Sequence, residues 1–477
     1  MKIYIIVVLL ILCSCSSNDD TNTILPPSLS STMVSGKVLD TDGKPIPNVV
    51  VSDGVQCFST NDNGEFAFET SPQRRPFVYI STPAEYELPE KDGIAFFYQP
   101  LKTDSVNENI NFILKRRNKK ITDFVYITIS DPQLKNEGDL NRFTTETLVD
   151  LAKTVQEFCD KPIIGVTLGD HVYDQMELFD SYKTAVSNRG LIMFSVIGNH
   201  DYNKNYVSLE RVVDKKNGYA QQNFNQTFGP TAYSFNIGNV HVVTLEDIDY
   251  RGNREYDKKI TSSQLNWLKE DLQFVPKSKI IFLNLHAATS ITTAGKVSNS
   301  NELYELLDGY NVHIFSGHSH AYENVCVNEK IFEHNIGAAC GAFWKGNVNK
   351  CGAPNGYLVT NVDKNDVSWY YKSTGKDKGY QFRVYKPGEF KSQSKYLVVN
   401  VWDYDPSWKV ECLDNGDKMS MERFEDEDQE FINQNKGSKG YYTNHLFRVS
   451  PDTKKETIEI NVTNRFGDVF VKSISLP

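Results

Sequence analysis

Five short apolar runs in the middle of the chain each end in a cluster of polar side chains. They span residues 124–130, 162–168, 191–196, 280–285 and 312–316. Runs of this length, bounded by Gly, Asp or Asn, are typical of buried strands. Apolar residues at helical spacing lie between them, at 143–158 and 262–272, the second with Ser262 as a candidate N-cap. This alternation predicts an α/β layered domain.

The polar residues that follow these strands combine carboxylates, amides and imidazoles. They are Asp131 and Gln133, then Asp170, then Asn199 with His200 and Asp201, then His286, and finally His318 and His320. In open α/β sheets, ligands bind at the carboxyl ends of the strands. A set of this composition without a thiolate suits a divalent metal ion. The sequence therefore predicts a metal centre at one edge of the sheet.

The order of these blocks resembles that of the calcineurin-like metallophosphoesterases. The matching blocks are Asp131-Pro132-Gln133, Gly169-Asp170, Gly198-Asn199-His200-Asp201, His286 and Gly317-His318-Ser319-His320. The resemblance covers about residues 120 to 370. It implies a two-sheet α/β sandwich that hydrolyses phosphate esters with two divalent metal ions and a metal-bridging hydroxide as nucleophile.

The resemblance also implies a role for each residue. The first ion would be held by Asp131, Gln133, Asp170 and His320, and the second by Asp170, Asn199, His286 and His318. Asp170 would bridge the two ions. His200 would stabilise the transition state or protonate the leaving oxygen, with Asp201 as its partner. Asp174 lies one residue further from Asp170 than the common family spacing, so it would either orient a ligand or cap the next helix.

Gln133 is the main departure, because the commoner family pattern has His at this place. An amide supplies a neutral oxygen, which favours Mn²⁺ or Mg²⁺ over Zn²⁺ or Fe²⁺. Mn²⁺ is therefore the expected metal, with the other three as alternatives. The departure also motivates a different hypothesis, a surface binding or scaffold lipoprotein whose phosphoesterase core has decayed.

The first residues predict export and lipidation. Lys2 precedes an apolar run from Ile3 to Leu12, which is too short to span a bilayer and is typical of a signal peptide. Leu12-Cys13-Ser14-Cys15 resembles a lipobox, with Cys15 as the lipidated residue after a signal peptide at 1–14. The polar, acidic residues that follow resemble a signal for export to the cell surface. An outer-membrane or cell-surface lipoprotein is expected; the alternative is a soluble secreted protein.

Two further domains flank the predicted core, after a tether at 15–32. Residues 33–116 show short alternating strands and turn signals, and they resemble transthyretin-type, carboxypeptidase regulatory-like β-sandwiches. The phosphoesterase domain is expected at 120–375 and a C-terminal β-domain at 376–477, with strands at 396–402, 408–412 and 457–462. The predicted fold class is a calcineurin-like α/β sandwich between two all-β domains.

Charge narrows the choice of partner. The formal net charge is −10, so binding to nucleic acid through a basic surface is not expected. No basic residues cluster near the five blocks along the chain. Because a dianionic monoester needs such a clamp, phosphodiesters are the favoured substrates.

Several residues keep two interpretations. Trp344 and Tyr357 are candidate substrate contacts, although packing in the core is favoured. Cys340 and Cys351 either form a disulfide outside the cytosol or remain buried free thiols.

Overall fold

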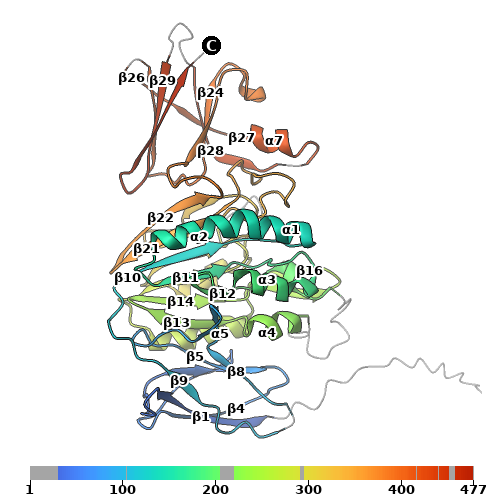
Figure 1. Cartoon of the computed structure of the whole chain (residues 1–477), viewed down its shortest axis with the longest axis vertical. Coiled ribbons are helices and arrows are strands. Elements are labelled where there is room, and N and C mark those ends of the chain that lie inside the picture. Colours follow the sequence, from blue (N-terminus) through green and yellow to red (C-terminus); the bar gives the residue numbers. More distant parts are fainter. Residues whose placement is uncertain are drawn as a thin grey trace, which may run out of the picture.

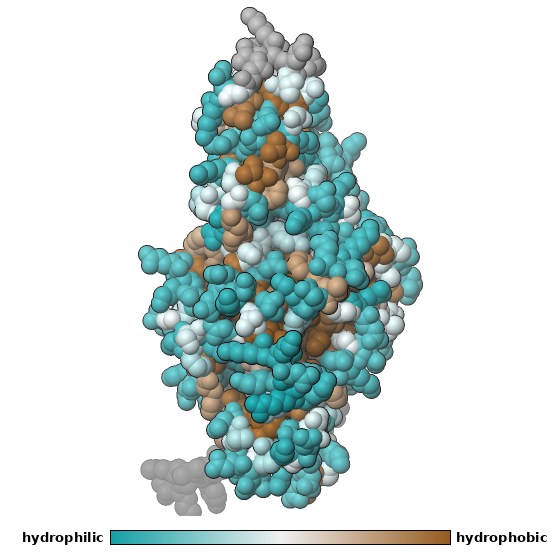
Figure 2. All heavy atoms as spheres, turned by 60° about the vertical axis from the view of Figure 1, so that its left-hand side comes forward, coloured by the Kyte–Doolittle hydropathy of each residue, from teal (hydrophilic) through white to brown (hydrophobic). Residues whose placement is uncertain are grey.

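In the computed structural model, three parts are stacked along the long axis of the molecule (Figure 1). The structure describes residues 31–103, 105–204, 220–290, 295–414, 416–438, 440–450 and 457–475. The predicted signal peptide, the lipidation site Cys15 and nearly all of the tether lie outside these residues. Figure 2 shows a broad middle and narrower ends, with apolar patches separated by hydrophilic residues on this face.

The first part packs two small antiparallel-rich sheets around their own core. Their strand orders are β4-β1-β9 and β3-β2-β5-β8. The first sheet has β1 (Thr32–Asp40), β4 (Glu65–Thr70) and β9 (Phe112–Leu114), and the second has β2 (Val50–Ser52), β3 (Cys57–Ser59), β5 (Phe77–Ser81) and β8 (Tyr98–Pro100). Alternate residues such as Val34, Val38, Phe66 and Phe68 point into the core between them.

The middle part is built on two larger sheets. The seven-stranded sheet has the order β22-β21-β10-β11-β12-β7-β6, and the six-stranded sheet has the order β13-β14-β17-β18-β20-β19. The first contains β6 (Glu90–Lys91), β7 (Ile94–Ala95), β10 (Asp123–Ile129), β11 (Ile163–Thr167), β12 (Ile192–Ser195), β21 (Gly356–Asp363) and β22 (Asp366–Ser373). The second contains β13 (Tyr233–Ile237), β14 (Val240–Thr244), β17 (Ile280–Asn284), β18 (Asn311–Ser316), β19 (Glu323–Cys326) and β20 (Ile331–Asn335). The predicted α/β core and its five strands are confirmed.

Helices accompany these sheets, and Figure 1 shows α1, α2 and α3 in front of the strands. They are α1 (Glu137–Arg142), α2 (Leu148–Glu157), α3 (Phe179–Val186), α4 (Gln222–Phe228), α5 (Ser262–Asp271) and α6 (Ser300–Leu306). A π-helical turn at Phe143–Thr147 joins α1 to α2, so the predicted helix begins earlier than expected. The N-cap of α5 is Thr261, whose side chain accepts from the Gln264 amide, and not Ser262.

Parallel pairing sets the position of the site. β10, β11 and β12 pair in parallel, as do β14, β17 and β18. Their carboxyl ends therefore reach the same edge of each sheet, where the predicted metal ligands follow the strands. β7, from the N-terminal region, also pairs in parallel with β12 and extends the core sheet.

The C-terminal part has two four-stranded sheets, with the orders β23-β24-β28-β27 and β26-β25-β29-β30. Their strands are β23 (Phe382–Tyr385), β24 (Leu397–Val401), β25 (Lys409–Asp414), β26 (Asp417–Met419), β27 (Glu422–Glu427), β28 (Tyr442–Val449), β29 (Thr457–Thr463) and β30 (Val469–Ser475). One helix, α7 (Gln429–Gln434), follows β27. The three strands predicted here are confirmed as β24, β25 and β29. Among the described residues, no helix is both long and apolar enough to cross a membrane.

Candidate metal centre

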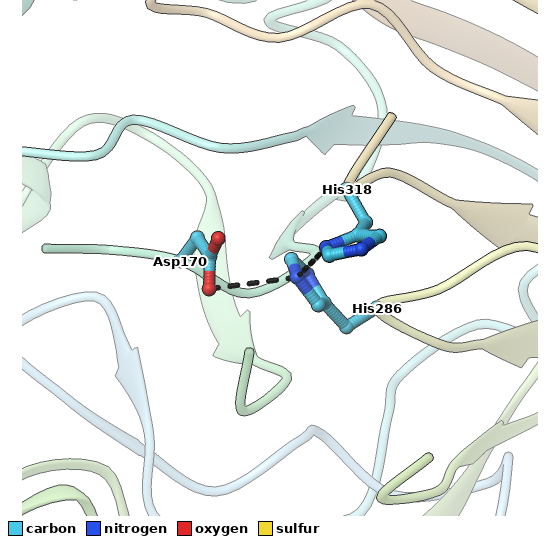
Figure 3. Close-up of side chains that lie close together, drawn as sticks. All are labelled: Asp170, His286 and His318. Carbon is cyan, nitrogen blue, oxygen red and sulfur yellow. Dashed lines mark hydrogen bonds and ion pairs between the residues drawn. The ribbon is translucent and has the colours of Figure 1, made fainter. Parts of the chain in front are cut away.

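His286 lies among polar atoms that come from three other strand ends. Its Nε2 is 3.4 Å from Asp170 Oδ1, 3.0 Å from Asn199 Oδ1 and 3.1 Å from His318 Nδ1. Figure 3 shows His286 between Asp170 and His318, with dashed lines to both. Ligand atoms of these three residues all lie within 4.8 Å of one another. The four residues are those that the family resemblance assigns to the second ion.

The remaining predicted ligands form a second group beside the first. His320 Nε2 is 3.4 Å from Asp131 Oδ1, and Gln133 Nε2 is 2.9 Å from Asp170 Oδ2. Asp170 therefore turns one carboxylate oxygen toward each group. A carboxylate placed in this way can bridge two cations. The tertiary structure thus brings all seven predicted ligands together.

Two unpartnered atoms test whether this site suits metal ions. Within the described part of the chain, Asp131 Oδ1 and Gln133 Oε1 are buried and have no hydrogen-bond partner. A buried acceptor without a partner is costly, and a cation would satisfy both oxygens. Carboxylate, amide and imidazole donors match the preferences of Mn²⁺, Mg²⁺ and Zn²⁺. The residues present therefore fit a pair of divalent ions.

The hydrogen bonds of the histidine rings leave one nitrogen of each free for a metal. His286 Nδ1 faces the carbonyl oxygen of Leu168 at 2.8 Å, and His320 Nδ1 faces that of Gly341 at 2.6 Å. Each Nδ1 must donate to its carbonyl, so each Nε2 keeps its lone pair. Burial lowers the pKa of His318 to about 3, which keeps that ring neutral and able to coordinate.

Backbone conformation at the strand ends is unusual. The residues with positive φ include Asp131 (48°), Gln133 (45°), Asp170 (52°), His318 (67°) and His320 (54°). The left-handed region is uncommon for residues other than Gly, Asn and Asp, and such strain gathers at functional sites. Close packing adds to it: a Cβ on Gly317 would lie 1.8 Å from Ser130 Oγ. The backbone at these strand ends therefore keeps strained conformations that direct the predicted ligand side chains toward the site.

His200 is oriented by Asp174, and the prediction that Asp201 is its partner is wrong. His200 Nδ1 lies 2.8 Å from Asp174 Oδ1. The ring also stacks on Tyr173, with centroids 3.9 Å apart and planes inclined by 21°. Because Asp174 is held in a left-handed conformation (φ 63°), its carboxylate reaches back to the imidazole.

Asp201 has a structural role instead. Its Oδ2 accepts from the Gly198 amide at 2.9 Å and lies 3.0 Å from His171 Nδ1. Its Oδ1 accepts from the Val172 amide at 3.3 Å. The side chain points away from His200 because these buried partners satisfy it, so it fastens two ligand-bearing loops together.

Basic residues surround the site, which corrects the expectation that no such cluster exists. Lys204 Nζ is 3.6 Å and Arg254 Nη1 is 3.8 Å from the carboxylate of Asp174. On the other side, Lys350 Nζ lies 5.4 Å from the centre of the Phe343 ring, and that ring packs on His320. Arg254 and Lys350 lie far from the blocks along the chain, so only the fold brings them to the site, whereas Lys204 follows Asp201 by three residues.

Two buried carboxylates near the ligands were not predicted. Asp247 accepts from the amides of His286 and Ala287 at 3.2 and 2.7 Å. Glu333 accepts from the Thr289 amide at 2.8 Å and from Ser316 Oγ at 2.8 Å. A signal existed for Asp247, because it follows the apolar strand β14 as the ligands follow theirs. Glu333 lies within β20, where no such signal exists.

The remaining candidates pack into the protein. Trp344 is 8% exposed and donates from Nε1 to the Pro132 carbonyl, whereas Tyr357 is fully buried and donates to Asp150. Neither lies open to a substrate. Cys340 and Cys351 are buried free thiols, so the disulfide between them is not formed.

Solved structures similar to this chain include several phosphate-processing proteins. A dimetal phosphatase from Danio rerio is 12% identical, with 52% of this chain and 96% of that chain covered and a TM-score of 0.38. A 5'-nucleotidase from Candida albicans is 14% identical, with coverages of 54% and 53% and a TM-score of 0.33. The NAD nucleotidase of Haemophilus influenzae is 10% identical, with coverages of 54% and 50% and a TM-score of 0.30. The comparison with curated proteins found no match.

Family models match all three parts of the chain. Residues 126–322 match the calcineurin-like phosphoesterase, residues 32–117 the N terminal of calcineurin-like phosphoesterase, and residues 333–470 its C terminal. The predicted metal ligands from Asp131 to His320 lie within the first match. Together with the convergent ligand set, these matches show that the chain belongs to the calcineurin-like phosphoesterase family.

Proposed function

We propose that this metallophosphoesterase hydrolyses phosphate esters outside the cytoplasm with two divalent ions, Mn²⁺ first among them. Family membership supplies the enzyme class and the dinuclear centre. The observation that carries the proposal is the position of Asp170, which presents one oxygen to His286 and the other to Gln133. Asp131 and His320 would complete the first ion's site, and Asn199 and His318 the second's.

The chain's own residues then prepare the substrate and its leaving group. Bound ions would supply Lewis acidity toward phosphate oxygens and would acidify water at the site. His200, held by Asp174 and stacked on Tyr173, presents its Nε2 as the proton donor for the leaving oxygen. Lys204 adds positive charge where the phosphate would bind.

A decayed scaffold is not supported by the site. Loss of function usually removes ligands or their supports, yet here all seven side chains converge and both histidine tautomers are fixed by carbonyl partners. Gln133 keeps an oxygen at its position, so the substitution changes the ligand and does not delete it.

The activity test uses purified protein, Mn²⁺ and the mono- and bis-p-nitrophenyl phosphates. We expect turnover in the wild type and a loss of metal from both sites in Asp170→Ala, measured by metal analysis. His200→Gln should keep its metal but lose about 100- to 10,000-fold in kcat, the usual contribution of general acid catalysis. Folded wild-type protein that is inactive on both esters with Mn²⁺, Mg²⁺ and Zn²⁺ would disprove the proposal.

The preference between phosphate monoesters and diesters is a separate question. The preference for diesters rested on a lack of basic residues near the blocks, and Lys204, Arg254 and Lys350 remove that support. The prediction still has a direct test: the ratio of kcat/KM for a diester and a monoester with the same leaving group. A ratio above one favours diesters.

We also propose that the protein is anchored to the outer membrane or cell surface through lipid on Cys15. The support is the lipobox-like sequence after a short apolar run. Metabolic labelling with radioactive palmitate tests it. Cys15→Ala should lose the label and appear in the soluble fraction, whereas Cys13→Ala serves as the matched control and should keep the label. Equal labelling of both variants would reject Cys15 as the anchor.

A further inference from the structure

The hairpin of β15 (Ile248–Gly252) and β16 (Glu255–Lys258) reaches the metal centre. Tyr256 on β16 meets the ring of His318 edge-on, with centroids 6.2 Å apart. Arg254 at the tip places its Nη1 3.8 Å from Asp174 Oδ2. The hairpin therefore contacts both a metal-site histidine and the carboxylate that orients His200. In Figure 1, β16 lies at the right-hand edge of the core.

The hairpin is fastened in this position. Tyr250 stacks on Tyr202, with centroids 4.9 Å apart and planes inclined by 19°. Tyr202 in turn donates from its hydroxyl to the Ile248 carbonyl at 2.9 Å. The Arg254 amide donates to the Tyr250 hydroxyl at 3.2 Å, which ties the tip to the same stack. The guanidinium of Arg254 is therefore presented from a fixed support.

The turn itself keeps Arg254 in an unfavourable conformation. Asn253 and Arg254 have φ of 51° and 64°, so both central residues are left-handed, as in a type I′ turn. Glycine is the usual second residue of this turn, because a Cβ is strained there. Uncommon backbone conformations concentrate at functional sites, so the side chain at position 254 calls for a functional explanation.

Charge around Asp174 is unbalanced. Its Oδ1 holds His200 and lies 3.6 Å from Lys204 Nζ, while its Oδ2 faces Arg254. One carboxylate thus serves two cations and an imidazole. Burial would raise the pKa of Asp174, but the bond from His200 and the charges of Lys204 and Arg254 outweigh it and lower the pKa. An additional anion is the complementary partner for this group.

Arg254 has donors left for such an anion. Its side chain is 71% exposed, and a guanidinium offers five N–H donors in a planar fork. Among the described residues its one ion pair, at 3.8 Å, leaves most of these donors without a charged partner. The other arginine of the hairpin, Arg251, faces Asp257 at 3.5 Å and so provides a matched comparison.

We propose that Arg254 binds a second anionic group of the substrate, a carboxylate or phosphate that lies beyond the phosphate to be cleaved. The inference rests on the proposed function, because it places the cleaved phosphate between the metal ligands and His200. Arg254 is then a specificity-determining residue, and the preferred substrates are phosphate esters that carry an additional negative charge.

Non-hydrolysable ligands test this without relying on turnover. Calorimetry of the Mn²⁺-loaded protein compares a short series of ω-carboxyalkylphosphonates with alkylphosphonates of the same chain length. We expect the wild type to bind the best carboxylated ligand about tenfold more tightly than the alkylphosphonate of the same chain length. This is the usual contribution of a charge-assisted hydrogen bond. Arg254→Ala should abolish this preference, Arg254→Lys should keep part of it, and Arg251→Ala should keep it fully.

The outcomes separate this inference from the proposed function. A wild type with no preference at any chain length, or a preference that survives Arg254→Ala, overturns the role of Arg254. An equal loss of affinity for both ligands in Arg254→Ala shows that it only positions Asp174, which also overturns the inference. Hydrolysis of p-nitrophenyl phosphate is measured in parallel: a preference without hydrolysis rejects the function alone, and hydrolysis without a preference rejects the inference alone.

Discussion

Gln133 is the residue that we expect to decide which ions suit the first proposed metal site. Its Nε2 lies 2.9 Å from Asp170 Oδ2, and its Oε1 is buried without a hydrogen-bond partner among the residues that the structure describes. An imidazole nitrogen binds Zn²⁺ and Fe²⁺ more tightly than an amide oxygen does, whereas Mg²⁺ gains little. We expect Gln133→His to raise Zn²⁺ affinity relative to Mg²⁺ by roughly 10- to 100-fold, measured by competitive loading and metal analysis. Gln133→Ala should lose only the first ion. An unchanged metal preference in Gln133→His would show that residue 133 does not coordinate.

Asp174 and Asp201 allow a comparison at the same scale. Asp174 holds His200, whereas Asp201 accepts from backbone amides and contacts His171. Asp174→Asn should lower kcat about 10- to 100-fold, with metal content and thermal stability preserved, because only the orientation of His200 changes. Asp201→Asn should instead lower the melting temperature, since an amide cannot accept from all of these donors. Equal effects of the two variants on kcat and stability would contradict this division of roles.

At the scale of elements, the site depends on how closely the strand ends approach. A Cβ on Gly198, after β12, would lie 2.3 Å from Asp170 Oδ1 and 2.9 Å from His286 Cε1. Gly198→Ala should therefore displace the bridging carboxylate and reduce metal content to below about one ion per chain, as judged by metal analysis of folded protein. The exposed Gly379, which meets only the Asp377 side chain at 3.0 Å, is the control and should keep both ions as Ala. Full occupancy in Gly198→Ala would mean that these loops can separate without loss of the site.

At the scale of the whole molecule, the C-terminal part is joined to the core through a buried carboxylate. Asp403, which follows β24, is 1% exposed and accepts from the Tyr322 hydroxyl and the Asn324 amide at 2.7 Å each. Asp403→Ala leaves these buried donors without a partner, so we expect unfolding free energy to fall by about 2–4 kcal/mol. The exposed Asp417 is the control, and its replacement by Ala should cost less than about 0.5 kcal/mol in the same denaturation experiment. A similar loss in both variants would show that Asp403 does not join the two parts.

The sequence by itself determined the elements and the ligand set. Apolar runs such as those of β10 and β17 are continuous because both faces of a core sheet are buried, so their short length and the polar residues that bound them mark them as strands. A metal ligand that directly follows a strand keeps a fixed relation to it, which makes Asp131 and His286 visible in one dimension. The N-cap Thr261 and the start of α1 at Glu137 were missed, because element ends depend on hydrogen bonds that the pattern does not record.

Only the tertiary structure decided which residues surround the ligands. The sequence predicts Asp201 as the partner of His200, because it is the next residue along the chain. That Asp174 takes this place follows from the left-handed turn at Asp174 and from the amides that occupy Asp201. Lys204, Arg254 and Lys350 come from three separate loops, and nothing in the local sequence shows that these cations approach the site. The physical reason is the separation of the interacting residues along the chain. Strand and helix patterns arise from residues that are close in sequence. The electrostatic field at a site is the sum of charged and polar groups that only folding brings together.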